Sequence, residues 1–209
     1  MHDTLIFDFD GTLIDSAPGI LATYAEVFAA AGLQPAVPLD QSLIGPPLAP
    51  TMQKLLGRDE PGLLAQLVED FKPRYMTTGL DNTPPYPDAD ATLRQLAKDK
   101  TLFIATNKRA EPTLALLERF GWTPLFRDIY CIDTQQPAYP DKTAMLGQLL
   151  VDHDLAAERC LYVGDTHGDQ AAATACGIAF MAALWGYDTW AQAESPLRCA
   201  TLGSLGAAF

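Results

Sequence analysis

The segment Leu5-Ile6-Phe7-Asp8-Phe9-Asp10-Gly11-Thr12 carries the strongest structural signal in the chain. Its short apolar run is typical of a strand buried in a parallel sheet, and Asp10-Gly11-Thr12 has the composition of a turn that ends it. Asp8 and Asp10 are two residues apart, so a regular strand would place both carboxylates on one face. A carboxylate after a buried strand is partly desolvated and needs a cation or hydrogen bonds to offset that loss of hydration.

Four similar apolar runs follow farther along the chain, at Leu102–Ala105, Ile129–Ile132, Cys160–Val163 and Ile178–Met181. The stretches between them carry apolar residues at helical spacing, for example Leu114, Leu117 and Phe120. Strands that alternate with helices predict an α/β fold, with a Rossmann-like parallel sheet core and helices on both faces.

The interval between the first and second predicted strands departs from this alternation. Apolar stripes at helical spacing occupy it without an intervening strand: 20–31, 48–56 and 63–71. Residues 79–87 have the composition of a return linker. We therefore expect an inserted α-helical cap domain over residues 16–82, and an α/β hydrolase core formed by residues 1–15 and 83–209.

The composition excludes several classes of partner. The 209 residues include 26 acidic and 14 basic ones, which gives a formal net charge of −12. A nucleic-acid-binding protein carries a basic face, so we expect no nucleic-acid partner. No apolar run approaches the roughly 20 residues of a membrane-spanning helix, and the N-terminus lacks the pattern of a signal peptide. We therefore expect a cytoplasmic protein with no membrane partner; the pattern does not predict an oligomeric state.

Polar side chains follow the later strands as well. Thr106 and Asn107 end the second strand, Lys142 begins a helix after Pro140-Asp141, and Asp165 and Asp169 follow the strand Cys160–Val163. Each signal has a plainer structural reading as a turn, a helix cap or a solvated lysine. Because parallel strands end at one edge of a sheet, their joint occurrence at four strand ends favours one shared site.

Asp8-Phe9-Asp10-Gly11-Thr12-Leu13-Ile14-Asp15-Ser16 resembles the first motif of the haloacid-dehalogenase-like hydrolases. The resemblance is to the phosphoglycolate-phosphatase-like branch, which has a small α-helical cap. Thr106, Lys142 and the pair Asp165/Asp169 are similar to the second, third and fourth motifs. One departure concerns the third motif, because Gln136-Pro137 stands where many members have Lys-Pro-x-Pro. Lys142 is the lysine nearby and fits members that place it at the helix start.

The resemblance implies a magnesium-dependent phosphomonoester hydrolase that acts on a small phosphorylated metabolite through an aspartyl-phosphate intermediate. It makes Asp8 the nucleophile and Asp10 the general acid and then the general base. The phosphate-binding residues it implies are Thr106, Asn107 and Lys142. The Mg²⁺ ligands it implies are Asp8, Asp10 through its backbone carbonyl, Asp165, and Asp169 as an additional or indirect ligand.

Two other functions remain open at this level. A β-phosphoglucomutase-like phosphoryl transfer would keep both Asp8 and Asp10. A non-enzymatic phospho-acceptor module, such as a receiver domain, also combines an acidic cluster, a Thr or Ser and a Lys around a phosphorylatable Asp. The helical insertion and Asp10 disfavour the receiver. The pattern does not identify the cap residues that select the substrate.

Overall fold

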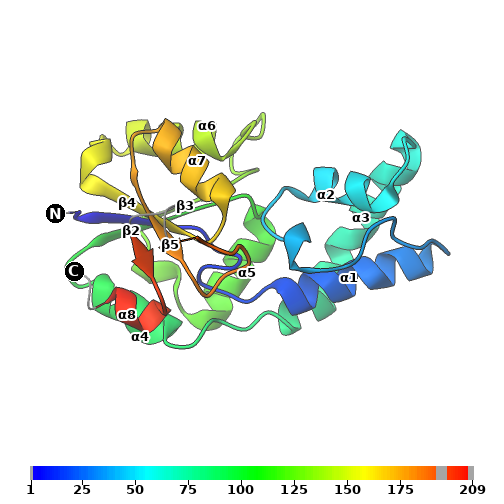
Figure 1. The fold of residues 1–209 in the computed structure, drawn as a ribbon, viewed down its shortest axis with the longest axis horizontal. Helices are drawn as coiled ribbons and strands as arrows, with labels where there is room; N and C mark the ends of the chain where they lie inside the picture. Colours follow the sequence, from blue (N-terminus) through cyan, green and yellow to red (C-terminus); the bar gives the residue numbers. More distant parts are fainter. Residues whose placement is uncertain (1, 192–196, 207–209) are drawn as a thin grey trace. The chain divides into compact units, whose positions relative to one another are not determined.

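A computed structural model describes residues 2–191 and 197–206 of the chain. Its internal contacts divide the chain into two units, Met1–Ile14 with Pro85–Phe209, and Asp15–Pro84. We call the first unit the core and the second the cap. The core is an α/β fold, as predicted, and the cap is helical (Figure 1).

The core is built on a parallel sheet whose strands run in the order β3-β2-β1-β4-β5-β6. The strands are β1 (Thr4–Phe7), β2 (Thr101–Thr106), β3 (Asp128–Cys131), β4 (Cys160–Gly164), β5 (Ala179–Ala183) and β6 (Arg198–Cys199). β1 is central, and Phe7 at its end is in register with Ile104 of β2 and Val163 of β4. The residues that follow these three strands therefore emerge side by side at one edge of the sheet.

Helices cover both faces of the sheet. They are α4 (Ala89–Leu96), α5 (Ala110–Phe120), α6 (Lys142–Asp152), α7 (His167–Ala175) and α8 (Leu202–Leu205), with short 3₁₀ turns η3 (Thr123–Leu125) and η4 (Ala157–Arg159). Figure 1 shows α6 and α7 on one face and α4, α5 and α8 on the other. Alternate strand residues such as Ile6, Phe103 and Tyr162 are buried with Met145 and Leu149 of α6. Both faces of β1 are therefore buried, which explains its continuous apolar run.

Two helix starts in the core are fixed by side-chain caps. The carboxylate of Asp141 accepts a hydrogen bond of 2.8 Å from Ala144 N, so α6 begins at Lys142. Thr166 and Asp169 form a reciprocal capping box at the start of α7. These caps place Lys142 and Asp169 in the first turns of helices that begin at the carboxyl edge of the sheet.

The cap contains α1 (Ala17–Ala30), a 3₁₀ turn η1 (Gln41–Leu43), α2 (Leu48–Leu56), α3 (Pro61–Arg74) and a π-helical turn η2 (Tyr75–Gly79). Its core is aromatic: the ring of Phe71 lies 4.8 Å from that of Tyr24 and 5.6 Å from that of Tyr75. The three helices lie where the apolar stripes predict them. The π-helical turn was not predicted, and it follows Pro73, whose missing N–H interrupts the hydrogen-bond ladder of α3.

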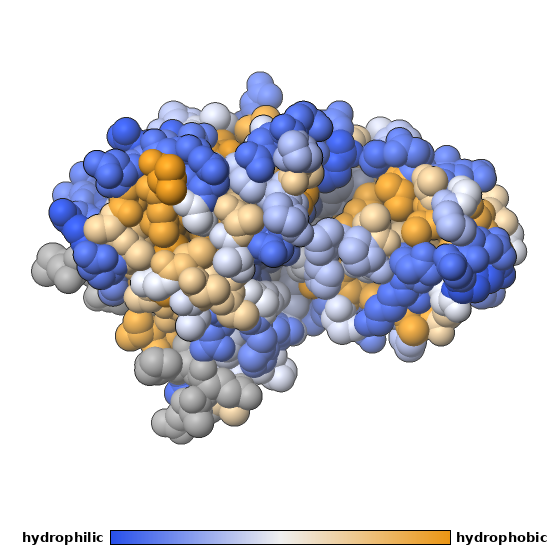
Figure 2. Space-filling model, turned by 90° about the horizontal axis from the view of Figure 1, so that it is seen from above, coloured by the Kyte–Doolittle hydropathy of each residue, from blue (hydrophilic) through white to orange (hydrophobic). Residues whose placement is uncertain are grey.

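No helix among residues 2–191 and 197–206 is long and apolar enough to cross a bilayer. The large hydrophobic side chains exposed among the described residues are Leu114 in α5, Val151 in α6, Leu184 after β5 and Leu197 before β6. Figure 2 shows hydrophilic residues interspersed with smaller hydrophobic groups on the face it presents. Such scattered residues are ordinary on a protein surface.

Two glycines in first turns of cap helices provide a matched test of cap packing. A Cβ at Gly19 would lie 2.2 Å from the backbone oxygen of Gly79, whereas a Cβ at Gly62 would have no atom within 4 Å. We predict that Gly19→Ala lowers the free energy of unfolding by about 1–3 kcal/mol, because the backbone must move. Gly62→Ala should change it by less than about 0.5 kcal/mol. Urea denaturation measures both, and equal effects would contradict the packing described here.

Candidate active site

Three carboxylates meet at the carboxyl edge of the sheet. Asp8 follows β1, Asp165 follows β4, and Asp169 lies in the first turn of α7. One carboxylate oxygen from each of the three lies within 4.8 Å of those of the other two, and the three residues are at most 2% exposed. Asp8 N donates to Val163 O at 2.9 Å, so the pairing of β1 with β4 continues to Asp8. We call these three residues the carboxylate cluster.

Lys142 reaches the carboxylate cluster from the first residue of α6. Its Nζ lies 3.0 Å from Asp8 Oδ1 and also forms a close ion pair with Asp169. The ammonium lies 5.6 Å from the ring centre of Tyr162, whose hydroxyl donates to Ala105 O at 2.7 Å. The lysine is buried, so it adds one fixed positive charge among three carboxylates.

Burial shifts the acid–base properties of the cluster. It raises the pKa of the Asp8 carboxyl to about 7; the Lys142 ammonium opposes this rise, and Asp169 and Asp10 add to it. Burial also raises the pKa of Asp165 well above its usual value, and the charges of Asp169 and Asp8 add to the shift. Burial works against the charged form of Lys142, but Asp169 and Asp8 outweigh it and raise the pKa of that ammonium.

The cluster fits a divalent cation. Asp8 Oδ1 is a buried oxygen that lacks a hydrogen bond of good geometry among the described residues, although the Lys142 ammonium is close. Three carboxylates around one ammonium leave an excess of negative charge in a desolvated place. A hard cation such as Mg²⁺ prefers carboxylate oxygens and would compensate that charge, which also favours the ionised forms of Asp8 and Asp165.

The three carboxylates are not equivalent. Asp169 Oδ2 accepts hydrogen bonds from Thr166 N at 3.0 Å and Thr166 Oγ1 at 2.7 Å, and its Oδ1 pairs with Lys142. Asp169 thus holds α7 and Lys142 in place, and this leaves it fewer lone pairs for a cation. Asp8 and Asp165 therefore fit direct contact with a cation better than Asp169 does.

The side chain of Asp10 forms an ion pair that the sequence did not suggest. Lys108 Nζ lies 3.0 Å from Asp10 Oδ1 and 3.3 Å from Oδ2, and both side chains are nearly buried. The side chain of Asp10 is outside the carboxylate cluster. A contribution of its backbone carbonyl to a metal site stays a prediction. The signal available in the sequence was the polar run Thr106-Asn107-Lys108, which begins at the last residue of β2 and ends with Lys108.

The predicted phosphate-binding residues of β2 lie at the same edge. Thr106 is buried at the strand end, and its Oγ1 accepts a hydrogen bond of 3.2 Å from Lys108 N. That bond leaves the hydroxyl proton of Thr106 to donate to an oxygen of a ligand. Asn107 is partly exposed in the same loop. Their role in binding phosphate stays a prediction.

A loop after β5 encloses Asp165; we call residues Trp185–Trp190 the tryptophan loop. Tyr187 N donates to Asp165 Oδ2 at 2.8 Å, and Trp190 Nε1 donates to the backbone oxygen of Asp165 at 3.0 Å. Trp185 Nε1 donates to Thr12 O at 2.9 Å, while Thr12 Oγ1 donates to Asp165 Oδ1 at 3.2 Å. The loop thus fixes both the backbone and one carboxylate oxygen of Asp165.

The tryptophan loop is itself anchored to the start of α7. His167 Nδ1 lies 2.8 Å from Asp188 Oδ2, and His167 N donates to the same oxygen at 2.9 Å. The imidazole stacks on Trp190 with ring centres 4.2 Å apart. His167 is half-exposed and is held by these contacts at the side of the site.

Two glycines make the close packing around Asp165 possible. A Cβ at Gly186 would lie 2.1 Å from Asp165 Cβ, and one at Gly11 would lie 2.2 Å from Asp165 Oδ2. Gly11 also has a φ of 80°, a conformation that glycine adopts without strain. No other residue fits either position without displacing Asp165.

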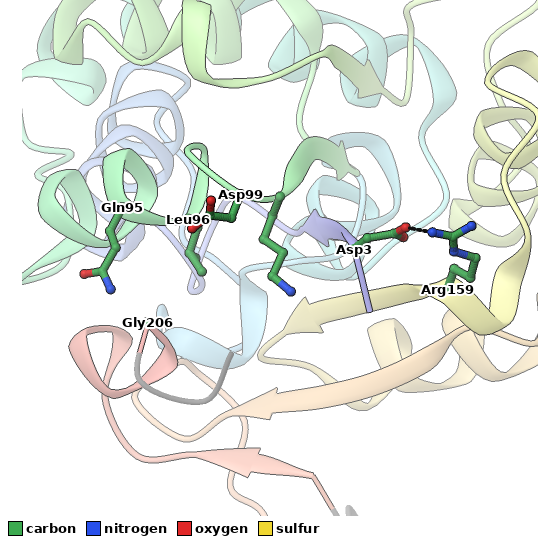
Figure 3. Close-up of a pocket in the computed structure, with 7 residues that line it drawn as sticks. Asp3, Gln95, Leu96, Asp99, Arg159 and Gly206 are labelled. Carbon is green, nitrogen blue, oxygen red and sulfur yellow. Dashed lines mark hydrogen bonds and ion pairs between the residues drawn. The ribbon is translucent and has the colours of Figure 1, made fainter. Parts of the chain in front are cut away.

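A separate hollow lies at the opposite edge of the sheet (Figure 3). It has a volume of about 550 Å³, and the residues that line it are Asp3, Gln95, Leu96, Asp99, Lys100, Arg159 and Gly206. Its cations are already engaged: Arg159 pairs with Asp3, and Lys100 Nζ donates to His2 O at 2.8 Å. It lies at the amino ends of β1, β2 and β4, away from the carboxylate cluster, so we do not assign the chemistry to it.

Comparisons with known proteins point to one family. The family model described as "Haloacid dehalogenase-like hydrolase" matches residues 5–183. A phosphoglycolate phosphatase of Xylella fastidiosa is 32% identical over 196 residues, which cover 88% of this chain and 81% of that protein. A 5'-nucleotidase of Pseudomonas aeruginosa is 28% identical over 209 residues, which cover 98% of this chain and 94% of that protein.

A solved structure shares the fold. It is a hydrolase of the haloacid dehalogenase-like family from Streptococcus pneumoniae, which aligns with a TM-score of 0.86 and 24% sequence identity. The alignment covers 100% of this chain and 98% of that one.

We predict that Gly186→Ala weakens Mg²⁺ binding by about 10–100-fold, the usual effect of disturbing a residue that orients a ligand. The added methyl group would overlap Asp165 Cβ and displace its carboxylate. Gly147→Ala in α6 is the matched control, because a Cβ there would have no atom within 4 Å. Calorimetric titration with Mg²⁺ measures both, and unchanged affinity in Gly186→Ala would contradict the role given to the loop.

We also predict that Asp8→Asn stabilises the metal-free protein at pH 8 by roughly 2–4 kcal/mol. The pKa of Asp8 rises from 3.8 to about 7 on folding, so the carboxyl is protonated in both the folded and the unfolded state below pH 3.8. As the pH rises above 3.8 and through 7, the unfolded state loses this proton more readily, and the folded protein becomes less stable. Asparagine carries no such charge, so the difference between the two proteins should vanish near pH 4.

The measurement for this prediction is urea denaturation in EDTA across the pH range. The exposed substitution Asp59→Asn serves as the control and should have no effect on stability. Added Mg²⁺ should stabilise the wild type but not Asp8→Asn, because binding to the folded state adds to stability. Equal stabilities of wild type and Asp8→Asn at pH 8 in EDTA would disprove the buried-charge account.

Proposed function

Because the chain belongs to the haloacid dehalogenase-like hydrolases, we propose that it hydrolyses phosphate monoesters of small metabolites through a phosphorylated Asp8. The observation that carries this proposal is the geometry around Asp8. A buried carboxylate at the end of the central strand lies against one ammonium and within 4.8 Å of two further carboxylates. This is the arrangement that attack on a phosphorus atom requires, provided that the excess negative charge is compensated.

Charge repulsion is the main obstacle in the first half of the reaction. A carboxylate and a phosphate dianion 4 Å apart repel each other by about 8 kcal/mol at an effective dielectric constant of 20. The Lys142 ammonium, 3.0 Å from Asp8 Oδ1, reduces this repulsion directly. Bound at the carboxylate cluster, Mg²⁺ would supply the remaining positive charge and polarise the phosphoryl oxygens.

In the first step the phosphoryl group is transferred to Asp8, and Asp10 and Thr106 assist the transfer. An oxygen of Asp8 forms a bond to phosphorus while the bond from phosphorus to the ester oxygen breaks. Asp10 donates a proton to that leaving oxygen, so the product departs as a neutral alcohol. The hydroxyl of Thr106 donates to an equatorial oxygen of the transferred group.

The second step restores the enzyme. Asp10, now ionised, takes a proton from a water molecule whose oxygen attacks the phosphorus of the phosphorylated Asp8. The bond from phosphorus to Asp8 breaks, inorganic phosphate leaves, and Asp10 is protonated again. One water is consumed in each cycle, and the two carboxyl groups return to their initial state.

We propose small phosphorylated metabolites as the substrate class, with phosphoglycolate-like acids and nucleoside monophosphates as the first candidates. The similar proteins are a phosphoglycolate phosphatase and a 5'-nucleotidase, and they differ from each other in the group that carries the phosphate. The core residues described above act on the phosphoryl group, which both substrates share.

The experiment that tests this function is a phosphate-release screen with Mg²⁺ present. We expect turnover of at least one of 2-phosphoglycolate, nucleoside 5'-monophosphates, sugar phosphates and p-nitrophenyl phosphate. Chelation with EDTA should abolish it and added Mg²⁺ should restore it. Asp8→Asn should lower kcat by at least about 10³-fold, because the nucleophile is gone, whereas the exposed control Asp59→Asn should not.

A hydroxylamine-labile phosphate on Asp8, found by mass spectrometry after rapid quenching, would identify the intermediate. The absence of Mg²⁺-dependent release from every compound would contradict the proposed function. A long-lived phosphorylated Asp8 without turnover would indicate a phospho-acceptor module instead.

A further inference from the structure

Asp10 and Lys108 form a buried ion pair that none of the steps above uses. The ammonium of Lys108 contacts both oxygens of Asp10, at 3.0 and 3.3 Å. The side chains are 5% and 11% exposed, so water screens the pair weakly. The carboxylate of Asp10 is therefore directed to the loop after β2 and not to the carboxylate cluster.

The position of Lys108 is fixed independently of Asp10. Its backbone N–H donates to Thr106 Oγ1 at 3.2 Å, and its carbonyl accepts from Ile132 N at 3.4 Å. These bonds tie the residue to the ends of β2 and β3. The backbone of Lys108 is therefore held in place, and its ammonium group can fix the position of the Asp10 side chain.

The site contains two buried lysines with separate partners. Lys142 pairs with Asp8 and Asp169, whereas Lys108 pairs with Asp10. Asp8 and Asp10 are two residues apart at the end of β1, so their carboxylates repel each other when both are ionised. Without Lys108, the same repulsion and the attraction of Lys142 or a bound cation would allow Asp10 to leave its place.

We propose that Lys108 is a positioning residue that holds the carboxyl group of Asp10 beside the leaving oxygen of the substrate. This assignment rests on the proposed function, because it concerns Asp10 as the acid of that reaction. Proton donation requires the carboxyl group within hydrogen-bond reach of the leaving oxygen, and its orientation decides the rate. Lys108 acts through Asp10, and Lys142 serves the phosphoryl group.

The proposal makes a specific demand on the leaving group. An alkoxide must receive a proton as it departs, whereas 2,4-dinitrophenolate departs without one. A residue that acts only by placing the acid therefore affects alkyl phosphates and leaves activated aryl phosphates unaffected. A residue that binds the phosphoryl group, or that supports the fold, affects both alike.

The test compares kcat/KM of wild type and Lys108→Met on 2-phosphoglycolate or β-glycerophosphate and on 2,4-dinitrophenyl phosphate. We expect a loss of about 10²-fold or more on the alkyl phosphate, the usual contribution of a general acid. On the aryl phosphate we expect a loss of less than about threefold. Lys98→Met, which removes an exposed lysine of the core, should change neither value.

A double-mutant cycle keeps the test decisive even if the single variant folds poorly. Asp10→Asn with Lys108→Met removes both charges and preserves the approximate volumes of the side chains. We expect this double variant to match Asp10→Asn on both substrates, because Lys108 has no further effect once the acid is gone. Mg²⁺ affinity, measured by calorimetry, should not be weakened in Lys108→Met.

Equal losses on the alkyl and aryl phosphates would overturn the proposal, as would an undiminished rate of Lys108→Met on the alkyl phosphate. A further loss when Lys108→Met is added to Asp10→Asn, or weakened Mg²⁺ binding, would show that Lys108 acts elsewhere in the site. If the wild type hydrolyses none of these compounds, the proposed function itself fails. That result is distinct from a failure of the role given to Lys108.

Discussion

The concentration of negative charge at the end of the central strand is the constraint on which the rest of the core depends. Three carboxylates lie within 4.8 Å of one another in a place that water hardly reaches. Such an arrangement is unfavourable by itself, because each buried carboxylate loses its hydration and repels the others. The surrounding residues either compensate this charge or hold it in place.

Compensation comes from elements that are distant in sequence. Lys142 approaches from the first turn of α6, whose start is fixed by the cap residue Asp141. Lys108 lies in the loop after β2 and pairs with the carboxylate of Asp10, which is outside the carboxylate cluster. The three carboxylates of the cluster meet the single ammonium group of Lys142, and one divalent cation would carry the two positive charges that their ionised forms leave uncompensated.

The support of Asp165 shows how closely the site is packed. The tryptophan loop donates hydrogen bonds to the carboxylate and the backbone oxygen of Asp165. Gly11 and Gly186 have no side chains, and a Cβ at either position would overlap Asp165. The close packing therefore keeps the carboxylates together although their charges repel, and the candidate active site is a place where the folded state is locally unfavourable. In the metal-free state, this unfavourable burial of charge raises the pKa values of Asp8 and Asp165.

Sequence alone determined the α/β fold and five of the six strands, because buried parallel strands and amphipathic helices have distinct periods. The family followed from the resemblance of residues 8–16 to its first motif. It also singled out Asp8, Asp10, Thr106, Lys142, Asp165 and Asp169, since polar residues after buried strands must gather at one edge of the sheet. It did not reveal β6, which has two residues and so no readable pattern.

Only the tertiary structure decided which charges meet. It paired Asp10 with Lys108, gave both oxygens of Asp169 structural partners, and wrapped the tryptophan loop around Asp165. These contacts join residues that are up to 173 positions apart, as in the bond from Trp185 to Thr12. Periodicity reports which face of an element is buried, but the partner of a buried charge is set by distances of a few ångströms that only the packed chain defines.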